Sequence, residues 1–395
     1  MRKSILGAIL FPAAIAGASC GSAQPVDSAR HSSPIPPRAP GADAASPFKV
    51  TPVGTFDEPW ALRFAPGTQT LFVTEKKGAL RFVELPSGRA GTVTGTPQVS
   101  YGGQGGLADV AFMPGEVKPA LSGRTIYLSW AEKGEGNNAG GAVGRGTLVC
   151  DSPTACRIAN LAVIWRQTPK TPGQLQYALR LTFSPDGKYL YVTSGDRVHI
   201  DSVQQTDNNL GKIVRLTPDR RPAPGNPLAA KGHQADEIWT MGHRNPLGLK
   251  FDATGRQWDL EHGPAGGDEL NLLKPGQNYG WPVVLNGDNY DGTPIPRHAT
   301  HPEFTAPAIS WNPVIAPGDF IFYSGKLWPQ WRGQALIAGL RTQAIVRVSI
   351  SGETAKAEAR YPMGHRMRDV IEASDGSLYA IEDGNVGRLV HLTPQ

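Results

Sequence analysis

The sequence is poor in charged residues and has no dense run of lysine or arginine. Charged residues make up 18% of its 395 residues, with 39 basic against 34 acidic side chains and a net charge of +5. So mild a balance argues against nucleic acid as a partner. The sequence also lacks an amphipathic pattern that would predict a helix of more than about three turns. Its 47 glycines and 35 prolines favour many turns between short strands instead.

The apolar run at the start of the chain is too short to cross a membrane. Ile5–Ala18 follows a basic start and predicts a secretory signal within residues 1–23. Cys20 follows small residues, as at a bacterial lipoprotein cleavage site, which predicts cleavage before Cys20 and a lipid anchor on it. Ordinary cleavage after Ala23 is the alternative. We therefore expect an exported, periplasmic protein that contacts a membrane only through a lipid at Cys20.

Cysteine is scarce, with three residues in the whole chain. Because an exported protein folds in an oxidising compartment, Cys150 and Cys156 are expected to form a local disulfide. Two buried free thiols are the alternative, and the spacing does not indicate a metal site. Residues 24–47, which are rich in proline, serine and alanine, are typical of a disordered tether.

The rest of the chain, 48–395, contains six similar units of alternating apolar strands joined by Pro, Asp and Gly turns. The units cover Ala61–Leu85, Leu107–Glu132, Leu179–Asp219, Leu247–Gly263, Asp319–Ile350 and Asp369–Pro394. Repetition of this kind predicts an all-β fold, a six-bladed β-propeller of four-stranded antiparallel blades. A pair of β-sandwiches is the alternative, but it would not explain six copies. Phe48–Phe56 is expected to pair with the last unit and close the ring.

The stretch Met241–Pro282 is the most polar of the long connections and carries carboxylates among glycine and proline. Glycine and proline fix unusual backbone shapes, so main-chain carbonyls can point at a ligand. Carboxylate and carbonyl oxygens together are the donors that calcium prefers. A solvated surface loop is the alternative interpretation.

Long polar side chains recur where strands meet loops in different units. They are Gln104, Arg244, Asn245, Arg341, Arg366 and Arg368. In a propeller such junctions gather on one face, over the central channel. Four of the six are arginines, which need a polyanionic ligand if they converge because they otherwise repel one another. Each arginine taken alone could equally be a solvated surface residue.

The order of several motifs resembles the soluble aldose sugar dehydrogenases, the glucose/sorbosone dehydrogenase family. The motifs are GGQGGLADVAF, SGDR, LGKIVRL, GHRNPLGL, EHGPAGGDELNLLKPGQNYGWP and RMRDV, and the resemblance covers Phe48–Pro394. It implies a six-bladed propeller that depends on pyrroloquinoline quinone (PQQ) and calcium. It also implies a quinone-binding set of Gln104, Arg244, Asn245, Tyr290, Arg341, Arg366 and Arg368. Members usually have lysine where Arg341 stands, which keeps the charge but changes the donor geometry.

The resemblance also implies two calcium positions and a reaction. The carbonyls of Gly263 and Pro264 would support a calcium at the cofactor, and Glu269 with Tyr279 resembles the ligands of a structural calcium. The implied reaction oxidises the anomeric hydroxyl of an aldose to a lactone: a base removes the hydroxyl proton while hydride moves to the quinone. A soluble or membrane-bound acceptor would then take the electrons, and the protein would be a monomer or weak dimer.

One position departs from the family pattern. The implied catalytic positions fall on Gln176, Asp196 and Arg244, but the family has a histidine base where Gln176 stands, four residues before Arg180. An amide is not a general base near neutral pH. Asp196 resembles the acid that orients the missing histidine.

Three explanations remain open for this departure. Another base such as Asp196 or His199 serves, turnover is slow with proton loss to water, or the chain binds quinone or sugar without oxidising anything. A third class of function, a calcium-dependent lactonase, would need acids that converge on a channel cation. Its candidates are Asp196, Asp268 and Glu269.

Overall fold

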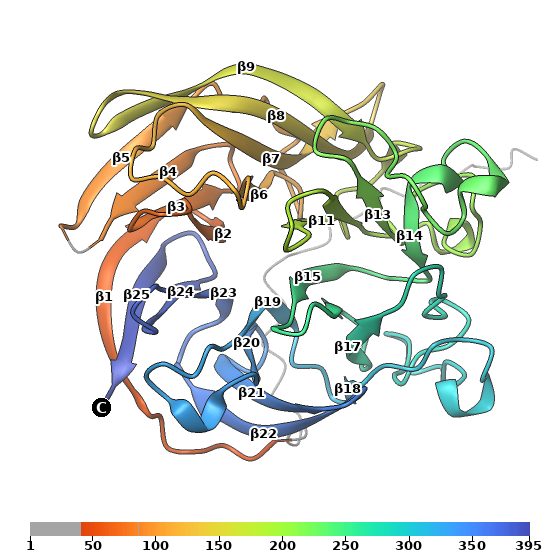
Figure 1. The fold of residues 1–395 in the computed structure, drawn as a ribbon. Helices are drawn as coiled ribbons and strands as arrows, with labels where there is room; N and C mark the ends of the chain where they lie inside the picture. The colour runs from red at the N-terminus through yellow and green to blue at the C-terminus, as the bar shows by residue number, and fades with distance from the viewer. Residues whose placement is uncertain (1–40, 86) are drawn as a thin grey trace, which may run out of the picture. The chain divides into compact units, whose positions relative to one another are not determined.

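The computed structural model describes residues 41–85 and 87–395, so the predicted signal segment and most of the predicted tether lie outside it. The described chain is a six-bladed β-propeller, as the repeats predict (Figure 1). Four sheets have four strands each, and a nine-stranded sheet comprises two further blades. No helix in the described residues is long and apolar enough to cross a membrane.

The first three blades follow one another along the chain. Blade 1 contains β2 (Pro59–Phe64), β3 (Thr70–Glu75), β4 (Leu80–Glu84) and β5 (Arg89–Thr94). Blade 2 contains β6 (Leu107–Phe112), β7 (Arg124–Lys133), β8 (Asn138–Ser152) and β9 (Ala155–Arg166), with the short β10 (Thr171–Pro172) paired to β8. Blade 3 contains β11 (Ala178–Phe183), β12 (Leu190–Ser194), β13 (Lys212–Leu216) and β14 (Ile238–Met241).

The last three blades complete the ring. Blade 4 contains β15 (Pro246–Phe251), β16 (Gln257–Glu261), β17 (Asp268–Leu273) and β18 (Ile309–Trp311). Blade 5 contains β19 (Pro317–Phe322), β20 (Ala335–Gly339), β21 (Ala344–Ser351) and β22 (Thr354–Pro362). Blade 6 contains β23 (Met367–Glu372), β24 (Leu378–Glu382), β25 (Gly387–Pro394) and the first strand of the domain, β1 (Phe48–Phe56).

Helical structure among the described residues is limited to five 3-10 turns of three residues each, all in loops. They are η1 (Ile200–Ser202), η2 (Ala229–Lys231), η3 (Ala235–Glu237), η4 (His298–Thr300) and η5 (Pro329–Trp331).

The innermost strand of each blade contacts the innermost strand of the next. The contacts run from β2 to β6, β11, β15, β19 and β23 and back to β2, which closes the ring around a central axis. The six strands surround the centre in Figure 1, and the later strands of each blade lie further out. Because a closed ring leaves only short outer edges, it limits the exposed edges of its sheets.

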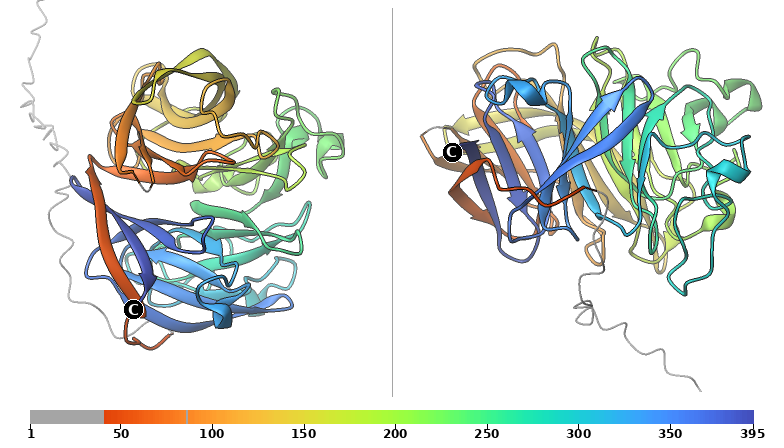
Figure 2. Two further views of the ribbon diagram at one scale, coloured as in Figure 1. Left: turned by 60° about the vertical axis from the view of Figure 1, so that its left-hand side comes forward. Right: turned by 90° about the horizontal axis from the view of Figure 1, so that it is seen from below.

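The ring is closed by pairing between the two ends of the domain. β1 runs antiparallel to β25, with Phe48 opposite Pro394 and Phe56 opposite Gly387 (Figure 2). This pairing confirms the expected role of Phe48–Phe56. Just before β1, Asp43 forms an ion pair with Arg360 at 3.1 Å, and Ala44 donates to the carbonyl of Arg360, so these residues of the predicted tether lie along β22.

Blades 1 and 2 are joined at their outer edges, which the repeat pattern did not predict. β5 pairs in parallel with β9 through residues 92–94 and 155–157, which creates the nine-stranded sheet. The disulfide between Cys150 and Cys156 closes the end of the β8–β9 hairpin beside this junction, and confirms the pairing expected from the sequence.

Aromatic side chains fill the interfaces between blades. Phe48 packs edge-on against Trp328, Trp331 and Tyr361, so β1, the outermost strand of blade 6, is attached to blade 5. Trp311 is fully buried in blade 4. These tryptophans therefore contribute apolar packing rather than an exposed sugar platform, as expected from the sequence.

A charged network fills the channel below the face on which the strands begin. Each innermost strand contributes one member: Arg63, Asp109, Arg180, Lys250, Asp319 and Asp369. Arg180 lies 3.3 Å from Asp369, 3.8 Å from Asp319 and 4.0 Å from Asp109. The three cations and three carboxylates balance, and burial without such pairing would be costly.

Candidate active site

The predicted site residues come together because they occupy equivalent places in the blades. Gln104, Gln176, Arg244, Ala316 and Arg366 each stand within three residues of the start of an innermost strand. Since the innermost strands begin on the same face of the ring, these positions gather around one mouth of the channel. Arg341 and Gly263 follow β20 and β16, whose ends pair with the beginnings of β19 and β15.

A cavity of about 310 Å³ lies at this mouth. Its walls come from five blades and include Trp60, Lys76, Gln104, Leu247, His262, Ala316, Leu340, Arg366, Arg368 and Asp383. This volume is at the small end of the range of ligand pockets. Its charged lining residues are the cations Lys76, Arg366 and Arg368 and the carboxylates Glu58 and Asp383, so a net positive charge is left that suits an anion.

Arg366 and Arg368 are held by one carboxylate, Asp383. Arg366 Nε donates to Asp383 Oδ2 at 2.8 Å, and Arg368 donates to Oδ1 from Nε at 2.9 Å and from Nη2 at 2.6 Å. Although burial opposes it, the two guanidinium groups lower the pKa of Asp383 to about 2. Arg368 also lies over the ring of Trp60 at 4.0 Å. One carboxylate cannot neutralise two arginines, so positive charge is left for a ligand.

Arg244 approaches the same cavity from blade 4. Its Nη1 donates to the carbonyls of His262 at 3.1 Å and Gly263 at 2.9 Å, and its Nη2 donates to the hydroxyl of Tyr290 at 3.3 Å. Burial, together with the positive charges of Arg244, Arg368 and Arg366, lowers the pKa of His262 to about 3. The charges of three of the four predicted arginines therefore keep this one imidazole neutral.

Gln176 lies between Asp196 and Arg244. With the amide assigned in the orientation that satisfies both neighbours, its oxygen accepts from Arg244 Nη2 at 2.9 Å and its nitrogen donates to both oxygens of Asp196, with Oδ2 at 3.2 Å. A Cβ at Gly195 would come within 2.0 Å of the Gln176 carbonyl, so only glycine allows this close approach of the two segments. The side chain of Gln176 thus contacts Asp196 and Arg244, the two residues that would be neighbours of the family's histidine.

Asp196 is fixed as a buried acceptor. Val198 N–H donates to its Oδ1 at 2.8 Å and Trp281 Nε1 donates to its Oδ2 at 2.8 Å. Burial raises the pKa of Asp196, and these donors and Arg244 oppose the rise. The carboxylate is fully enclosed, and the Gln176 amide lies against it.

The other predicted quinone-binding residues differ from one another in burial and in their contacts. Gln104 Oε1 accepts from the Gln176 N–H at 2.9 Å and from Asn245 Nδ2 at 3.5 Å, which links three of these positions. Asn245 is buried with its Oδ1 unpartnered. Tyr290 is 77% exposed and Arg341 is exposed. Arg341 follows Leu340, which lines the cavity, but the structure does not bring its guanidinium into the Arg366–Arg368 pair.

The Gly263–Pro264 turn lies beside the cavity and is anchored by Asp268. Asp268 Oδ1 accepts from the Gly263 N–H at 2.9 Å and Oδ2 accepts from the Ala316 N–H at 2.7 Å. Burial raises the pKa of Asp268 to about 7. The Gly263 carbonyl accepts from Arg244, and because a carbonyl oxygen has two lone pairs, one remains for a cation.

Glu269 and Tyr279 lie apart from that turn, in a buried cluster of their own. Burial and the negative charges of Glu261 and Asp259 raise the pKa of Glu269. Burial alone would lower the pKa of His243. The carboxylates of Asp259 and Glu261 outweigh burial and raise this pKa to about 9. The Tyr279 ring stacks on His243 at 4.9 Å between centroids.

The acids considered for a lactonase do not share one site. Asp268 and Glu269 are consecutive in β17, so their side chains point to opposite faces of the sheet. Within the described residues, Asp196, Asp268 and Glu269 do not form a metal-ligating group.

Three cavity residues were not predicted from the sequence. Trp60 precedes the first repeat, Lys76 lies in a turn with ordinary surface composition, and Asp383 belongs to an Asp-Gly turn. Lys76 Nζ donates to the Gly103 carbonyl at 2.9 Å and lies 5.9 Å from the Trp60 ring and 3.6 Å from Glu58 Oε1, so it adds to the cavity wall a cation paired with Glu58. Lys76 and Asp383 could have been found from their position in the repeat. Each directly follows the second strand of its blade, and the end of that strand lies beside the start of the innermost strand.

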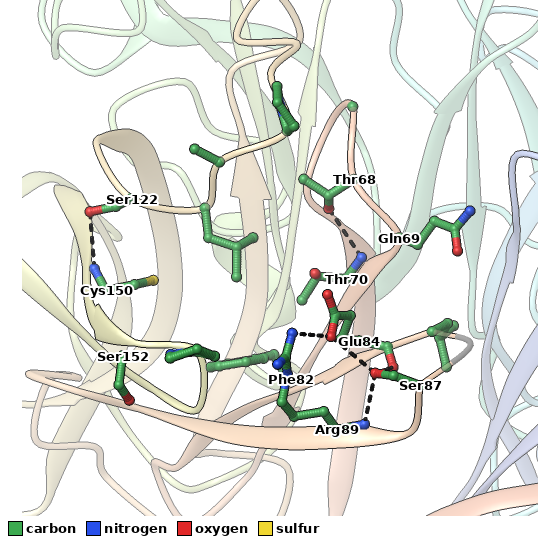
Figure 3. A pocket seen from close by; sticks show the side chains of 16 residues that line it. Thr68, Gln69, Thr70, Phe82, Glu84, Ser87, Arg89, Ser122, Cys150 and Ser152 are labelled. Carbon is green, nitrogen blue, oxygen red and sulfur yellow. Dashed lines mark hydrogen bonds and ion pairs between the residues drawn. The ribbon is translucent and has the colours of Figure 1, made fainter.

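A larger cavity, of about 890 Å³, lies between blades 1 and 2 at the other end of the strands (Figure 3). It is lined by the β2–β3 turn at Thr68–Thr70, by Phe82 and by the Glu84–Arg89 ion pair. It contains none of the predicted site residues, and its two charged groups satisfy each other. Size alone therefore does not make it the functional site.

Comparisons with known proteins agree with this geometry. A family model described as Glucose / Sorbosone dehydrogenase matches residues 56–391. The aldose sugar dehydrogenase YliI of Escherichia coli is 34% identical over 347 residues, which are 86% of this chain and 91% of YliI. The quinoprotein glucose dehydrogenase B of Acinetobacter calcoaceticus is 26% identical over 431 residues, with 85% of each chain covered.

Solved structures have the same ring. The apo-form of the soluble aldose sugar dehydrogenase from Escherichia coli superimposes with a TM-score of 0.80 at 33% identity, covering 88% of this chain and 100% of that one. The PQQ-bound aldose sugar dehydrogenase of Streptomyces coelicolor gives a TM-score of 0.70 at 25% identity, covering 89% and 100%. With the family model matched over most of the propeller, the chain belongs to the glucose/sorbosone dehydrogenase family.

Proposed function

We propose that this protein oxidises an aldose at the anomeric carbon to a lactone, with PQQ and calcium as cofactors. The observation that carries the proposal is that Lys76, Arg366 and Arg368 line one cavity with His262, whose carbonyl accepts from Arg244, so that four cations meet there against the carboxylates of Glu58 and Asp383. A cofactor with several carboxylates satisfies such a set, because arginine binds carboxylates in a bidentate manner. The relatives named above support sugar as the substrate class.

The residues present fit these cofactors. Lys76, Arg366 and Arg368 would bind carboxylates, and the unpartnered Oδ1 of Asn245 and the amide of Gln104 offer further polar contacts. The oxygens of Gly263 and Pro264 are donors of the type that calcium takes. Bound PQQ with its calcium would supply the hydride acceptor for the sugar.

The proton acceptor is where this chain differs from the resemblance. Gln176 cannot take the proton of the anomeric hydroxyl, and we propose that Asp196, the carboxylate behind it, accepts the proton during a slow turnover. Removal of a general base typically costs a factor of about 10² to 10⁴ in rate. In this proposal Gln176 and Arg244, which contact each other beside Asp196, orient the sugar hydroxyl.

Gln176 also favours a second function, that of a binding protein without turnover. If Asp196 remains covered, the propeller binds quinone or sugar without turnover. The two functions predict the same cofactor binding and differ only in the oxidation step.

Cofactor retention and activity test the proposal in turn. Purified protein is incubated with PQQ and calcium and passed through gel filtration, and the quinone absorbance that stays with the protein is measured. Glucose and a panel of aldoses are then added with an artificial electron acceptor, and dye reduction is followed. Retention with dye reduction supports the dehydrogenase, retention without it supports the binding protein, and no retention rejects both.

The cellular setting forms part of the proposal. Export to the periplasm, with or without a lipid on Cys20, would place the site among external sugars and near a soluble or membrane acceptor of electrons. Mass spectrometry of the mature N-terminus separates lipidated Cys20 from cleavage after Ala23. The mild net charge supports a protein that does not bind nucleic acid.

A further inference from the structure

Arg197, the last residue of the SGDR motif, is a buried arginine to which neither the proposed reaction nor the cofactor set gives a role. Its side chain is 1% exposed, and its guanidinium carbon lies 3.5 Å from the centre of the Tyr177 ring. Its Nε has no hydrogen-bond partner among the described residues. Because an incompletely paired arginine is costly to bury, its presence at this position needs an explanation.

The segment that carries Gln176 obtains most of its main-chain hydrogen bonds from Arg197. Residues 173–177 belong to no strand, yet each of their five carbonyls accepts a hydrogen bond. Arg197 provides three of the five donors, two from its side chain and one from its main chain. In order from Gly173 to Tyr177, the donors are Arg197 Nη2 at 2.6 Å, Gln104 N–H at 2.7 Å, Arg197 Nη1, Arg197 N–H at 3.3 Å and Gly195 N–H at 3.2 Å.

The backbone is strained on both sides of this contact. Five of the eleven described non-glycine residues with positive φ lie here, with φ between 54° and 72°. They are Gln176, Ala178, Leu179, Arg197 and Val198. A branched residue such as valine rarely adopts this conformation, and strained residues persist only where their surroundings over-determine them. The contacts of Arg197 provide that constraint.

The geometry points to Arg197 as the positioning residue that holds the Gln176 side chain against Asp196. Its main chain directly follows Asp196, and its side chain binds the segment that carries Gln176. A planar guanidinium suits this role, because it can donate to two carbonyls while its face lies on an aromatic ring. The consequence for catalysis rests on the proposed function, in which Gln176 orients the sugar hydroxyl beside Asp196.

The first test observes the contact itself and needs neither cofactor nor sugar. The full chain is labelled with 15N, and two NMR signals are followed, each assigned by the variant that lacks it. One is the side-chain amide of Gln176. The other is the indole N–H of Trp281, which donates to Asp196 Oδ2 at 2.8 Å. Arg197→Met should shift both signals away from their wild-type positions.

Arg215→Met is the matched control. Arg215 is also buried and stacked on aromatic rings, 4.6 Å from the Tyr189 ring and 4.2 Å from the Trp239 ring. It lies in the same blade but donates to Asn226 and to the Pro224 carbonyl, away from Gln176. Its replacement should leave both NMR signals unchanged.

The second test measures the consequence for catalysis. With saturating PQQ, calcium and aldose, Arg197→Met should lower kcat by about tenfold to a hundredfold, because a displacement of about 1 Å in an active site can cost that much. The Kd for PQQ, measured by equilibrium dialysis, should change less than kcat does. Arg197→Lys keeps the charge but cannot serve two carbonyls and stack at once, so it should also lose kcat.

The outcomes separate this proposal from the proposed function. If wild type oxidises no aldose, the proposed function fails and the two NMR signals alone decide the role of Arg197. Unchanged signals in Arg197→Met, the same shifts in Arg215→Met, or wild-type kcat in Arg197→Lys would overturn the proposal. If Arg197→Met does not fold, Tyr177→Leu, which removes the ring that the guanidinium contacts, is measured in the same way and must shift the same signals.

Discussion

Replacing Gln176 by histidine should restore the base that this chain lacks. The surroundings favour the replacement. Asp196 is already held by Val198 N–H and Trp281 Nε1, so it can accept a bond from an imidazole N–H and fix its tautomer. Residue 176 has φ of 54°, and histidine is among the residues enriched in this left-handed region.

The expected increase in kcat follows from the contribution of a general base to the reaction rate. A positioned base contributes a factor of about 10² to 10⁴ in rate, which corresponds to about 2.7–5.4 kcal/mol at 1.36 kcal/mol per tenfold. Arg244 Nη2 lies 2.9 Å from the present amide oxygen, so its charge should disfavour protonation of the new imidazole. The Asp196 carboxylate favours protonation and opposes this effect, so the histidine can take up and release a proton near pH 7.

The assay is steady-state dye reduction with saturating PQQ, calcium and aldose. We expect kcat of Gln176→His to rise at least about a hundredfold, with an acid limb set by the new imidazole in place of the one set by Asp196. Gln174→His is the matched control: it adds a histidine on the exposed neighbouring segment, away from Asp196, and should not change kcat. If Gln176→His retains the cofactor as well as wild type but shows no gain, position 176 is not the site of the missing base.

Three further predictions concern charge at and below the cavity. Arg368→Met should weaken PQQ binding by at least about tenfold, measured by equilibrium dialysis, because charge-assisted hydrogen bonds contribute about 1.5–3 kcal/mol; Arg388→Met, at an exposed ion pair with Glu382, is the control, and equal weakening would contradict the assignment. The pKa of Asp383 is depressed to about 2, so its stabilisation is complete above about pH 4 and is lost as the pH falls through 2. Urea unfolding should therefore show an acid loss of about 2 kcal/mol that is absent in Asp383→Asn, and identical pH profiles would refute this. Arg180→Met should lower the free energy of unfolding by about 3–5 kcal/mol, because it leaves buried carboxylates without a cation, and a loss below 1 kcal/mol would show that the channel network does not need it.

The fold could be predicted because it repeats. Alternation such as Leu190–Ser194 sets the strand period locally, and six copies give the blade number without any long-range information. The pairing of β1 with β25 is the expected pairing of Phe48–Phe56 with the last unit, which closes the ring. The parallel contact of β5 with β9 could not be predicted in this way, because it joins the outer edges of two blades and depends on the length of the β8–β9 hairpin rather than on the repeat.

The site was predictable where position in the blade decided it and less so elsewhere. Arg244, Arg366 and Arg368 precede or begin innermost strands, so the repeat placed them on one face. Arg341 follows β20 instead, and its exposed side chain shows that such a position does not fix the direction of a long flexible group. Asp383 was hidden because its Asp-Gly sequence is typical of any turn, and only its contacts with two arginines reveal its role.

The distribution of charge along the axis explains why the site opens on one face. Below the mouth, Arg63, Arg180 and Lys250 are matched by three aspartates, so this layer has no charge to offer a ligand. Arg180 also donates to the carbonyls of Leu247 at 2.7 Å and Trp60 at 3.5 Å, both of which line the cavity. The balanced layer thus forms the floor, and the unbalanced arginines lie above it. A polyanion entering from the mouth gains their attraction, whereas the paired layer below offers it none, so charge as well as shape sets its depth.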